Sequence, residues 1–150
     1  PADLVSSRLS ASSREFLTSV GLPTITVQEI EPIAHERLAE STFLHGREYV
    51  VVAESYDRTT RYGIDVRSDE VWYLDTDPSN TCLFNSSIAL FVLFLGIYQR
   101  SVLELEVTDQ DTLENAVAGV WSQLEARDPA ATDPGNYWEP ILDQVVSEYE

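Results

Sequence analysis

The side chains that could hold a transition metal are few in this sequence. The soft ligands are His35, His45 and Cys82. A zinc site needs several such ligands converging on one point, and the two histidines, ten residues apart, lack the spacing of a metalloprotease or a zinc finger. We therefore expect no bound metal and interpret the histidines as ordinary exposed or half-buried side chains.

The candidate nucleophiles have simpler structural explanations. Cys82 lies in the apolar stretch TCLF, where burial would raise the pKa of its thiol and shield it. Ser86 and Ser87 have no GxSxG motif around them and precede an apolar run, a position typical of helix capping. The glycines form neither GxGxxG nor GxxxxGK, which disfavours nucleotide hydrolysis.

A calcium loop is the remaining ion-binding motif to weigh. Asp75, Asp77 and Ser79 have the spacing of its first three ligands. However, the sixth position is Asn80 where a glycine is needed, and the twelfth is Ser86 where a glutamate is needed. A hairpin turn is the better interpretation. Catalysis by paired carboxylates stays open, because 26 acidic residues make any one pair uninformative. We expect no enzymatic activity and no cofactor.

The charge of the chain limits its partners. The 150 residues include 26 acidic and 9 basic side chains, for a net charge of -17. This charge disfavours direct binding to nucleic acid or to an anionic membrane and favours a basic protein partner. A hydrophobic content of 43% indicates a folded domain, so we expect a single domain over residues 1–150, with residues 1–11 flexible.

Cellular location is expected from cysteine content and from the absence of targeting patterns. One cysteine cannot form an internal disulfide, and the N-terminal residues do not resemble a signal peptide. The longest apolar run, Ile88 to Tyr98, would span about half of a bilayer's hydrocarbon core. We expect a cytoplasmic protein that does not cross a membrane. Both a monomer and a dimer are compatible with the sequence.

The elements that would position any site begin with a short helix. Ser12 and Glu15 have the spacing of a capping box, and Gly21 ends the segment, whose expected apolar face is Phe16, Leu17 and Val20. Residues 25–43 are expected to be irregular with a short helical turn.

Strand patterns then occupy residues 47–84. β-branched and alternating residues predict four short strands within residues 49–55, 61–67, 70–75 and 81–84. Turn-forming residues separate them at 57–60, 68–69 and 75–80. An antiparallel meander is the simplest topology.

Three helices are expected after the strands. A helix from about Ser86 to Gln99 is apolar on nearly every face, so we expect it to be the most buried element. Two amphipathic helices would cover it, and their apolar positions are Leu113, Val117, Val120, Trp121 and Leu124 in one and Trp138, Ile141, Leu142, Val145 and Tyr149 in the other. The predicted fold class is α+β, a small antiparallel sheet of about four to six strands with helices packed on one side.

Several of these segments together resemble a known family. FLTSVGLP, YVVVAES, YGIDV, EVWYLD and CLFNSSIALFVLFL are similar to segments of the SUKH superfamily of immunity proteins, closest to its fourth group, common in actinomycetes. The resemblance covers roughly residues 12–100. A turn that often contains glycine in the superfamily reads Ser68, Asp69, Glu70 here. The resemblance implies a SUKH-like fold and a non-catalytic cytosolic protein that binds and neutralises a polymorphic toxin, commonly a nuclease or a nucleic-acid deaminase.

Three functions therefore remain under consideration. The first is an immunity protein whose acidic surface mimics the nucleic-acid substrate of a basic toxin. The second is an adaptor or regulatory domain with an endogenous partner, and the third is an enzyme of unrecognised class. The family's contact residues vary with the toxin, so the partner surface is inferred from composition.

The expected partner surface is the set of hairpin ends. The apolar faces of the last two helices are already needed to cover the buried helix, which leaves the turns of the sheet. Their exposed aromatic and acidic residues are Tyr56, Asp57, Asp69, Glu70, Asp75 and Asp77. Carboxylates next to aromatic side chains could engage arginine or lysine of a toxin. The alternative is that these are simply solvated turn residues.

Overall fold

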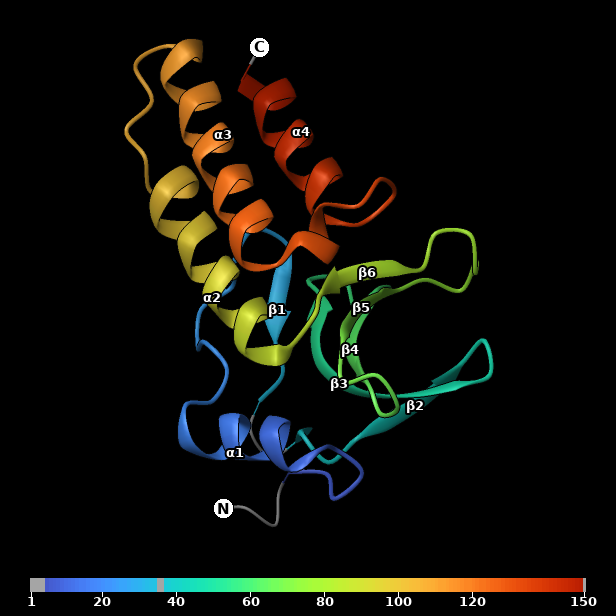
Figure 1. Ribbon diagram of the computed structural model, residues 1–150. Coiled ribbons are helices and arrows are strands. Elements are labelled where there is room, and N and C mark those ends of the chain that lie inside the picture. The colour runs from blue at the N-terminus through green and yellow to red at the C-terminus, as the bar shows by residue number, and fades with distance from the viewer. Residues whose placement is uncertain (1–4, 35–36, 150) are drawn as a thin grey trace.

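A curled antiparallel sheet packs against a layer of helices (Figure 1). The structure is a computed structural model and describes residues 5–34 and 37–149. The α+β class predicted from the sequence is confirmed. Among the described residues, no helix is long and apolar enough to cross a bilayer.

The sheet has six strands, two more than the strand patterns showed. They are β1 (Ile30–Pro32), β2 (Ser41–Leu44), β3 (Arg47–Ser55), β4 (Arg61–Asp65), β5 (Val71–Leu74) and β6 (Cys82–Asn85). The order is β1-β3-β4-β5-β6, and all pairs are antiparallel. The second edge of β3 is shared, since β2 pairs with its first half and β1 with its last residues. The four predicted strands are therefore confirmed, whereas the interpretation of residues 25–43 as irregular was wrong for β1 and β2.

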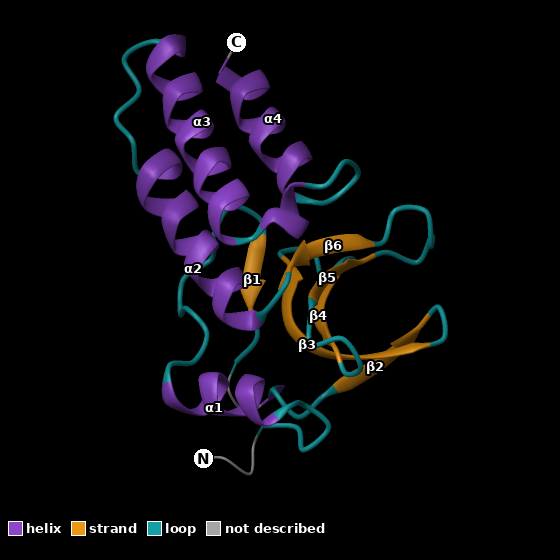
Figure 2. Cartoon of the chain, viewed as in Figure 1, coloured by secondary structure: helices purple, strands orange, loops and turns teal. Residues whose placement is uncertain are grey.

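The helices that follow the strands along the chain lie together on one side of the sheet (Figure 2). The helical elements are α1 (Ala11–Ser19), α2 (Ile88–Tyr98), a π-helical turn η3 (Gln99–Leu103), α3 (Gln110–Arg127), a 3-10 turn η4 (Pro129–Thr132) and α4 (Trp138–Tyr149). The helices α2, α3 and α4 pack together, with α2 and the start of α4 against the sheet, and α1 lies apart from α3 and α4, near the β4–β5 turn (Figure 1). Pro140 falls in the first turn of α4, where its missing N–H breaks no helical bond.

The core forms where α2 meets the sheet and α4. Phe91 and Phe94 are buried and contact the aromatic rings of Phe84 from β6 and Trp138 from α4. Six of the eleven residues of α2 are buried, more than in any other helix. Four of the five residues of β4 are buried, so the expectation that α2 is the most buried element was wrong. A central strand is covered on both faces of a curled sheet, whereas a helix keeps one exposed edge.

Three further buried apolar side chains, Tyr49, Leu74 and Leu83, lie outside the main core cluster. Gly63 approaches two of them closely, since a Cβ at that position would lie 2.9 Å from Tyr49 Cβ and 3.2 Å from Leu74 Cδ1. Glycine here serves a close approach between strands.

The N-terminal helix is capped two residues earlier than predicted. Ser10 Oγ accepts the Ser13 backbone N–H at 3.1 Å, so Ser10 and not Ser12 is the N-cap. Gly21 adopts the left-handed conformation just past the helix end, as its position predicted. Val20 is 69% exposed, so its assignment to the apolar face was wrong.

The residues before α1 are packed. Val5 and Leu9 are buried, and the Ser6 N–H donates a hydrogen bond to the carbonyl of Leu38. The expected flexibility of residues 1–11 was therefore wrong for 5–11, while residues 1–4 lie outside the described residues. Val5 and Leu9 lie four residues apart, and two apolar residues are too few to show a periodicity in the sequence.

A buried polar cluster joins β6, α2 and the two C-terminal helices. Asp128 is 1% exposed and accepts hydrogen bonds from Asn85 Nδ2 (2.9 Å), the Ser86 backbone N–H (3.0 Å) and Ser86 Oγ. Asn85 in turn accepts the indole N–H of Trp138 at 3.1 Å. A buried carboxylate is tolerated here because donors surround it.

Candidate functional site

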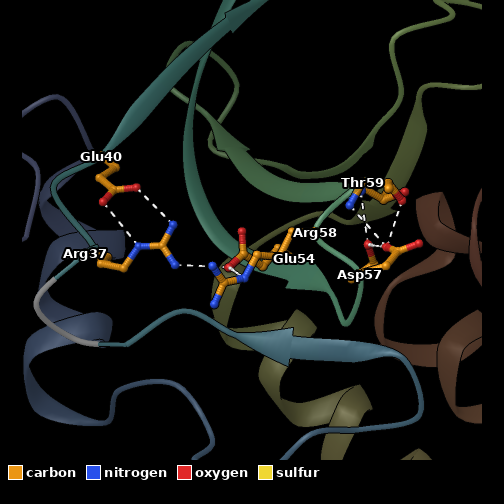
Figure 3. Close-up of polar contacts among 8 residues, drawn as sticks. Arg37, Glu40, Glu54, Asp57, Arg58 and Thr59 are labelled. Carbon is orange, nitrogen blue, oxygen red and sulfur yellow. Dashed lines mark hydrogen bonds and ion pairs between the residues drawn. The ribbon is translucent and has the colours of Figure 1, made fainter.

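The β3–β4 turn presents the most exposed aromatic side chain of the expected partner surface. Tyr56 is 79% exposed. Next to it, Asp57 accepts hydrogen bonds from Ser55 Oγ (2.6 Å), the Thr59 N–H (3.1 Å) and Thr59 Oγ1 (2.8 Å), as Figure 3 shows for Thr59. The Ser55 and Thr59 hydrogen bonds hold the pKa of Asp57 below its ordinary value. The turn is thus fixed by Asp57 and leaves Tyr56 free to contact a partner.

A cavity of about 360 Å³ lies beside this turn. It is lined by Gln28, Glu29, Ser55, Tyr56 and Asp57. The Tyr56 N–H donates to the carbonyl of Glu29 at 3.2 Å, and the Tyr98 hydroxyl donates to Gln28 Oε1 at 2.8 Å. Gln28 and Glu29 could not be recognised as site residues from the sequence, because their place depends on the unpredicted pairing of β1 with β3.

A charged cluster surrounds Glu54 at the end of β3 (Figure 3). Arg37 donates to both oxygens of Glu40 (3.2 and 3.3 Å) and to Glu54 Oε1 at 3.0 Å. These hydrogen bonds to Glu40 and Glu54 raise the pKa of Arg37. Arg58 Nε lies 3.8 Å from the same Glu54 oxygen. Although a 590 Å³ cavity adjoins this cluster, its two guanidinium groups are already paired with carboxylates, so it is poorly suited to an anionic ligand.

The β5–β6 turn contains two of the expected acidic residues in one hydrogen-bonded unit. The Asp77 N–H donates to Asp75 Oδ1 at 2.8 Å, and the Ser79 N–H donates to Asp77 Oδ1 at 2.9 Å. Ser79 and the nearby His45 lower the pKa of Asp77. His45 Nε2 also lies 2.8 Å from the carbonyl oxygen of Asp75. The interpretation of this segment as a hairpin turn is confirmed.

The β4–β5 turn is bound to the N-terminal helix. Asp69 has a left-handed backbone with a φ of 67°, and its carboxylate accepts hydrogen bonds from Ser10 Oγ (2.9 Å) and Ser13 Oγ (2.7 Å). Glu70 follows it, and its carbonyl accepts the Asp65 N–H at 2.8 Å. Asp69 therefore positions α1 in addition to lying at the surface.

The six expected contact residues do not form one surface. In an antiparallel meander the β3–β4 and β5–β6 turns lie at one end of the strands and the β4–β5 turn at the other. Tyr56 with Asp57, and Asp75 with Asp77, therefore belong to one end of the sheet, and Asp69 with Glu70 to the opposite end.

The candidate nucleophiles have the structural roles that their sequence context predicted. Ser87 Oγ caps α2 by accepting the Leu90 N–H at 3.2 Å, and Ser86 binds Asp128. Burial raises the pKa of Cys82 to about 11, which disfavours the thiolate. His35 lies outside the described residues, and within the described part of the chain no group of three or more His, Cys, Asp or Glu side chains could hold a metal ion.

Fold and surface together describe an acidic α+β domain whose exposed features are turns and helix faces. Its sequence matches the SUKH-4 immunity protein family over residues 1–144, and the chain belongs to this family. Neither the comparison with curated proteins nor the comparison with solved structures finds a match. Membership implies a toxin-neutralising immunity role with a cognate toxin as partner, in a family that is generally non-catalytic.

Proposed function

We propose that this protein binds a basic toxin that acts on nucleic acid, a nuclease or a deaminase, and neutralises it in the cytoplasm without catalysis. The observation that carries the proposal is the net charge of -17 in a member of a toxin-neutralising family. An enzyme that binds nucleic acid needs a basic surface, and an acidic protein competes for that surface.

The contact surface that we propose lies at the end of the sheet that holds Tyr56 and Asp57. Tyr56 offers a large exposed ring, and Asp57 and Glu29 supply carboxylates beside it. An aromatic anchor next to acidic groups is a composition that binds arginine well. Asp75 and Asp77 extend the surface at the same end of the sheet.

Asp69 and Glu70 are a separate part of the proposal. If they contact the toxin, they do so from the opposite end of the sheet. Reversing the charge of Asp69 would also release the hydroxyl groups of Ser10 and Ser13, so its loss would disturb α1 as well as any contact. Glu70→Arg is the cleaner test of this end.

Substitutions that spare the fold test the main surface. Tyr56→Ala combined with Glu29→Arg removes the ring and reverses a carboxylate without touching the Asp57 hydrogen bonds. We expect the affinity for the purified toxin to fall by about a hundredfold or more, since an interface anchor contributes about 2 kcal/mol or more. Phe43→Ala is the matched control, because Phe43 is a similarly exposed aromatic residue on β2. Equal affinities for all three proteins would place the interface elsewhere.

The ionic-strength dependence of association tests the electrostatic part. Opposite net charges steer two proteins together, and salt screens this attraction over about 8–10 Å. We expect the association rate constant to fall markedly between about 50 and 500 mM salt while the dissociation rate changes less. A rate that does not depend on salt would contradict charge-steered binding.

The alternative function is an adaptor domain with an endogenous partner. Affinity purification from the native host, followed by identification of the bound protein, separates the two. A toxin encoded next to this gene supports the immunity role, and a host regulatory protein supports the adaptor. An enzyme of unrecognised class is disfavoured by the state of the two candidate nucleophiles. The hydroxyl of Ser86 donates a hydrogen bond to Asp128, and burial raises the pKa of the Cys82 thiol.

A further inference from the structure

A groove runs between the two C-terminal helices, away from the sheet turns. The helices α3 and α4 lie side by side and antiparallel (Figure 1). The groove has a volume of about 420 Å³. Val117, Trp121, Leu142 and Val146 supply its apolar surface.

The groove residues form one stripe on each helix, and on α4 this stripe shares Leu142, which is 3% exposed, with the core. On α3 the groove residues are Glu114, Val117, Ala118 and Trp121, and on α4 they are Glu139, Leu142, Asp143 and Val146. Both sets have the spacing i, i+3, i+4, i+7, which places each on one helix face. The core stripe of α3 uses Leu113, Val120 and Leu124 instead. Val117, Trp121 and Val146 are only half-buried, so they keep apolar surface in the groove after the core is packed.

The rim of the groove is acidic. Its lining includes three carboxylates, Glu114, Glu139 and Asp143, and no cation. The chain around it has the same sign, since residues 101–150 contain twelve acidic side chains and one basic side chain, Arg127. An apolar floor with carboxylates on both sides fits a ligand that carries apolar groups flanked by positive charge.

We propose that this groove docks a basic amphipathic helix of the partner protein. A third helix laid along α3 and α4 would pack its apolar side chains on Trp121 and Val146 and place arginine or lysine beside the rim carboxylates. Glu114 to Trp121 spans about 10 Å, which accommodates two turns of such a helix. The inference rests on the proposed function for the partner's class, a basic toxin, and adds a second contact surface and the secondary structure that it accepts.

Charge distinguishes this occupant from the other candidates. A second copy of this chain would place the same carboxylates opposite one another. Nucleic acid and anionic lipid would meet the same repulsion.

The probe for the test is a synthetic 15-residue helical peptide with leucine at i, i+3, i+4 and i+7 and arginine on both flanks. A peptide of the same composition in scrambled order is the control for charge alone. Binding is followed by backbone NMR shifts and by the fluorescence of Trp121, assigned with Trp121→Phe, since the indole nitrogens of Trp72 and Trp138 are buried. We expect saturable shifts confined to residues 114–121 and 139–146.

Two charge-matched variants separate the groove from general acidity. Replacing Glu114, Glu139 and Asp143 together by lysine should weaken binding at least about tenfold. Replacing the exposed Glu106, Glu125 and Glu148 by lysine changes the net charge equally outside the groove and should change affinity by less than about threefold. Circular dichroism melting checks that both variants fold.

Three results would overturn the inference. They are equal binding of the scrambled peptide, equal loss in both triple variants, and shifts that map away from the groove or report self-association of this chain. The experiment contains no toxin, so its failure leaves the toxin-binding test intact. Failure of the toxin-binding test likewise leaves a measured peptide site standing.

Discussion

Replacing Asn85 by alanine should destabilise the protein more than its small size suggests. Asn85 is fully buried at the junction of β6 and α2. It donates to Asp128 at 2.9 Å and accepts the indole N–H of Trp138 at 3.1 Å. The substitution therefore removes the acceptor of one buried donor and one donor to a buried carboxylate at the same time.

The expected loss follows from these two contacts. An unsatisfied buried N–H costs about 1–3 kcal/mol, and a hydrogen bond to a charged group contributes about 1.5–3 kcal/mol. Asp128 keeps its two hydrogen bonds from Ser86, so its carboxylate still has hydrogen-bond donors. We expect the free energy of unfolding to fall by about 3–5 kcal/mol, against about 5–15 kcal/mol for a typical domain. For a chain of this length the corresponding decrease in Tm is about 6–20 °C.

Chemical and thermal unfolding measure this loss, and two further variants identify its cause. Asn115→Ala, at an exposed position of α3, should change stability by less than about 0.5 kcal/mol. Trp138→Phe removes the indole donor and keeps an aromatic ring, so its combination with Asn85→Ala should cost about 1–3 kcal/mol less than the sum of the single changes. A loss below about 1 kcal/mol in Asn85→Ala, or additive losses in the pair, would show that these buried hydrogen bonds do not stabilise the fold as expected.

Three further changes test packing and electrostatics elsewhere. Phe94→Ala removes a fully buried ring and should cost about 3–5 kcal/mol in urea unfolding, and a loss below about 1 kcal/mol would contradict its burial. Gly63→Ala forces a Cβ into contacts of 2.9 and 3.2 Å and should lower the free energy of unfolding by about 1–3 kcal/mol. Gly119→Ala lies in α3 with no atom within 4 Å of the new Cβ and should raise it by about 0.5–1 kcal/mol. Equal effects of the two changes would contradict the close approach at Gly63. The pKa values of Asp57 and Asp77 are lowered in the folded protein, so these two ionised carboxylates stabilise the fold above about pH 4. This contribution is lost as the pH falls through the lowered pKa values. The urea midpoint of Asp57→Asn/Asp77→Asn should therefore decline less between pH 5 and pH 2.5 than that of the unmodified protein, and parallel curves would show that these carboxylates make no such contribution.

The sequence predicted the elements whose patterns are strong and local. The strand from Arg47 to Ser55 contains a β-branched run, and the helix from Ile88 to Tyr98 is apolar throughout and follows a capping serine, Ser87. Periodicity of this kind reflects burial directly, so these elements could be recognised without tertiary information. The wrong capping residue of α1 has a local cause, since Ser10, Ser12 and Ser13 are chemically equal as caps and their order along the chain does not show where the helix begins.

The elements that were missed depend on distant contacts. β1 has three residues and includes Pro32, and β2 has four residues with Phe43 exposed, so neither shows a usable pattern. Both exist because the free edge of β3 accepts them. The same holds for the cavity at Tyr56, which needs Gln28 and Glu29 from the turn before β1. Turn composition correctly predicted the exposure of Tyr56, Asp57 and Asp77, whereas Asp69, Glu70 and Asp75 are half-buried. It could not predict which turns share an end of the sheet.

Neutralisation by binding is tested by titrating the activity of the purified toxin with this protein. We expect the activity to fall in proportion to the added protein, to reach zero near one equivalent, and to return when high salt dissociates the complex. Inactivation by a small fraction of an equivalent would indicate that the protein acts catalytically on the toxin. Full toxin activity at a large molar excess would contradict binding itself.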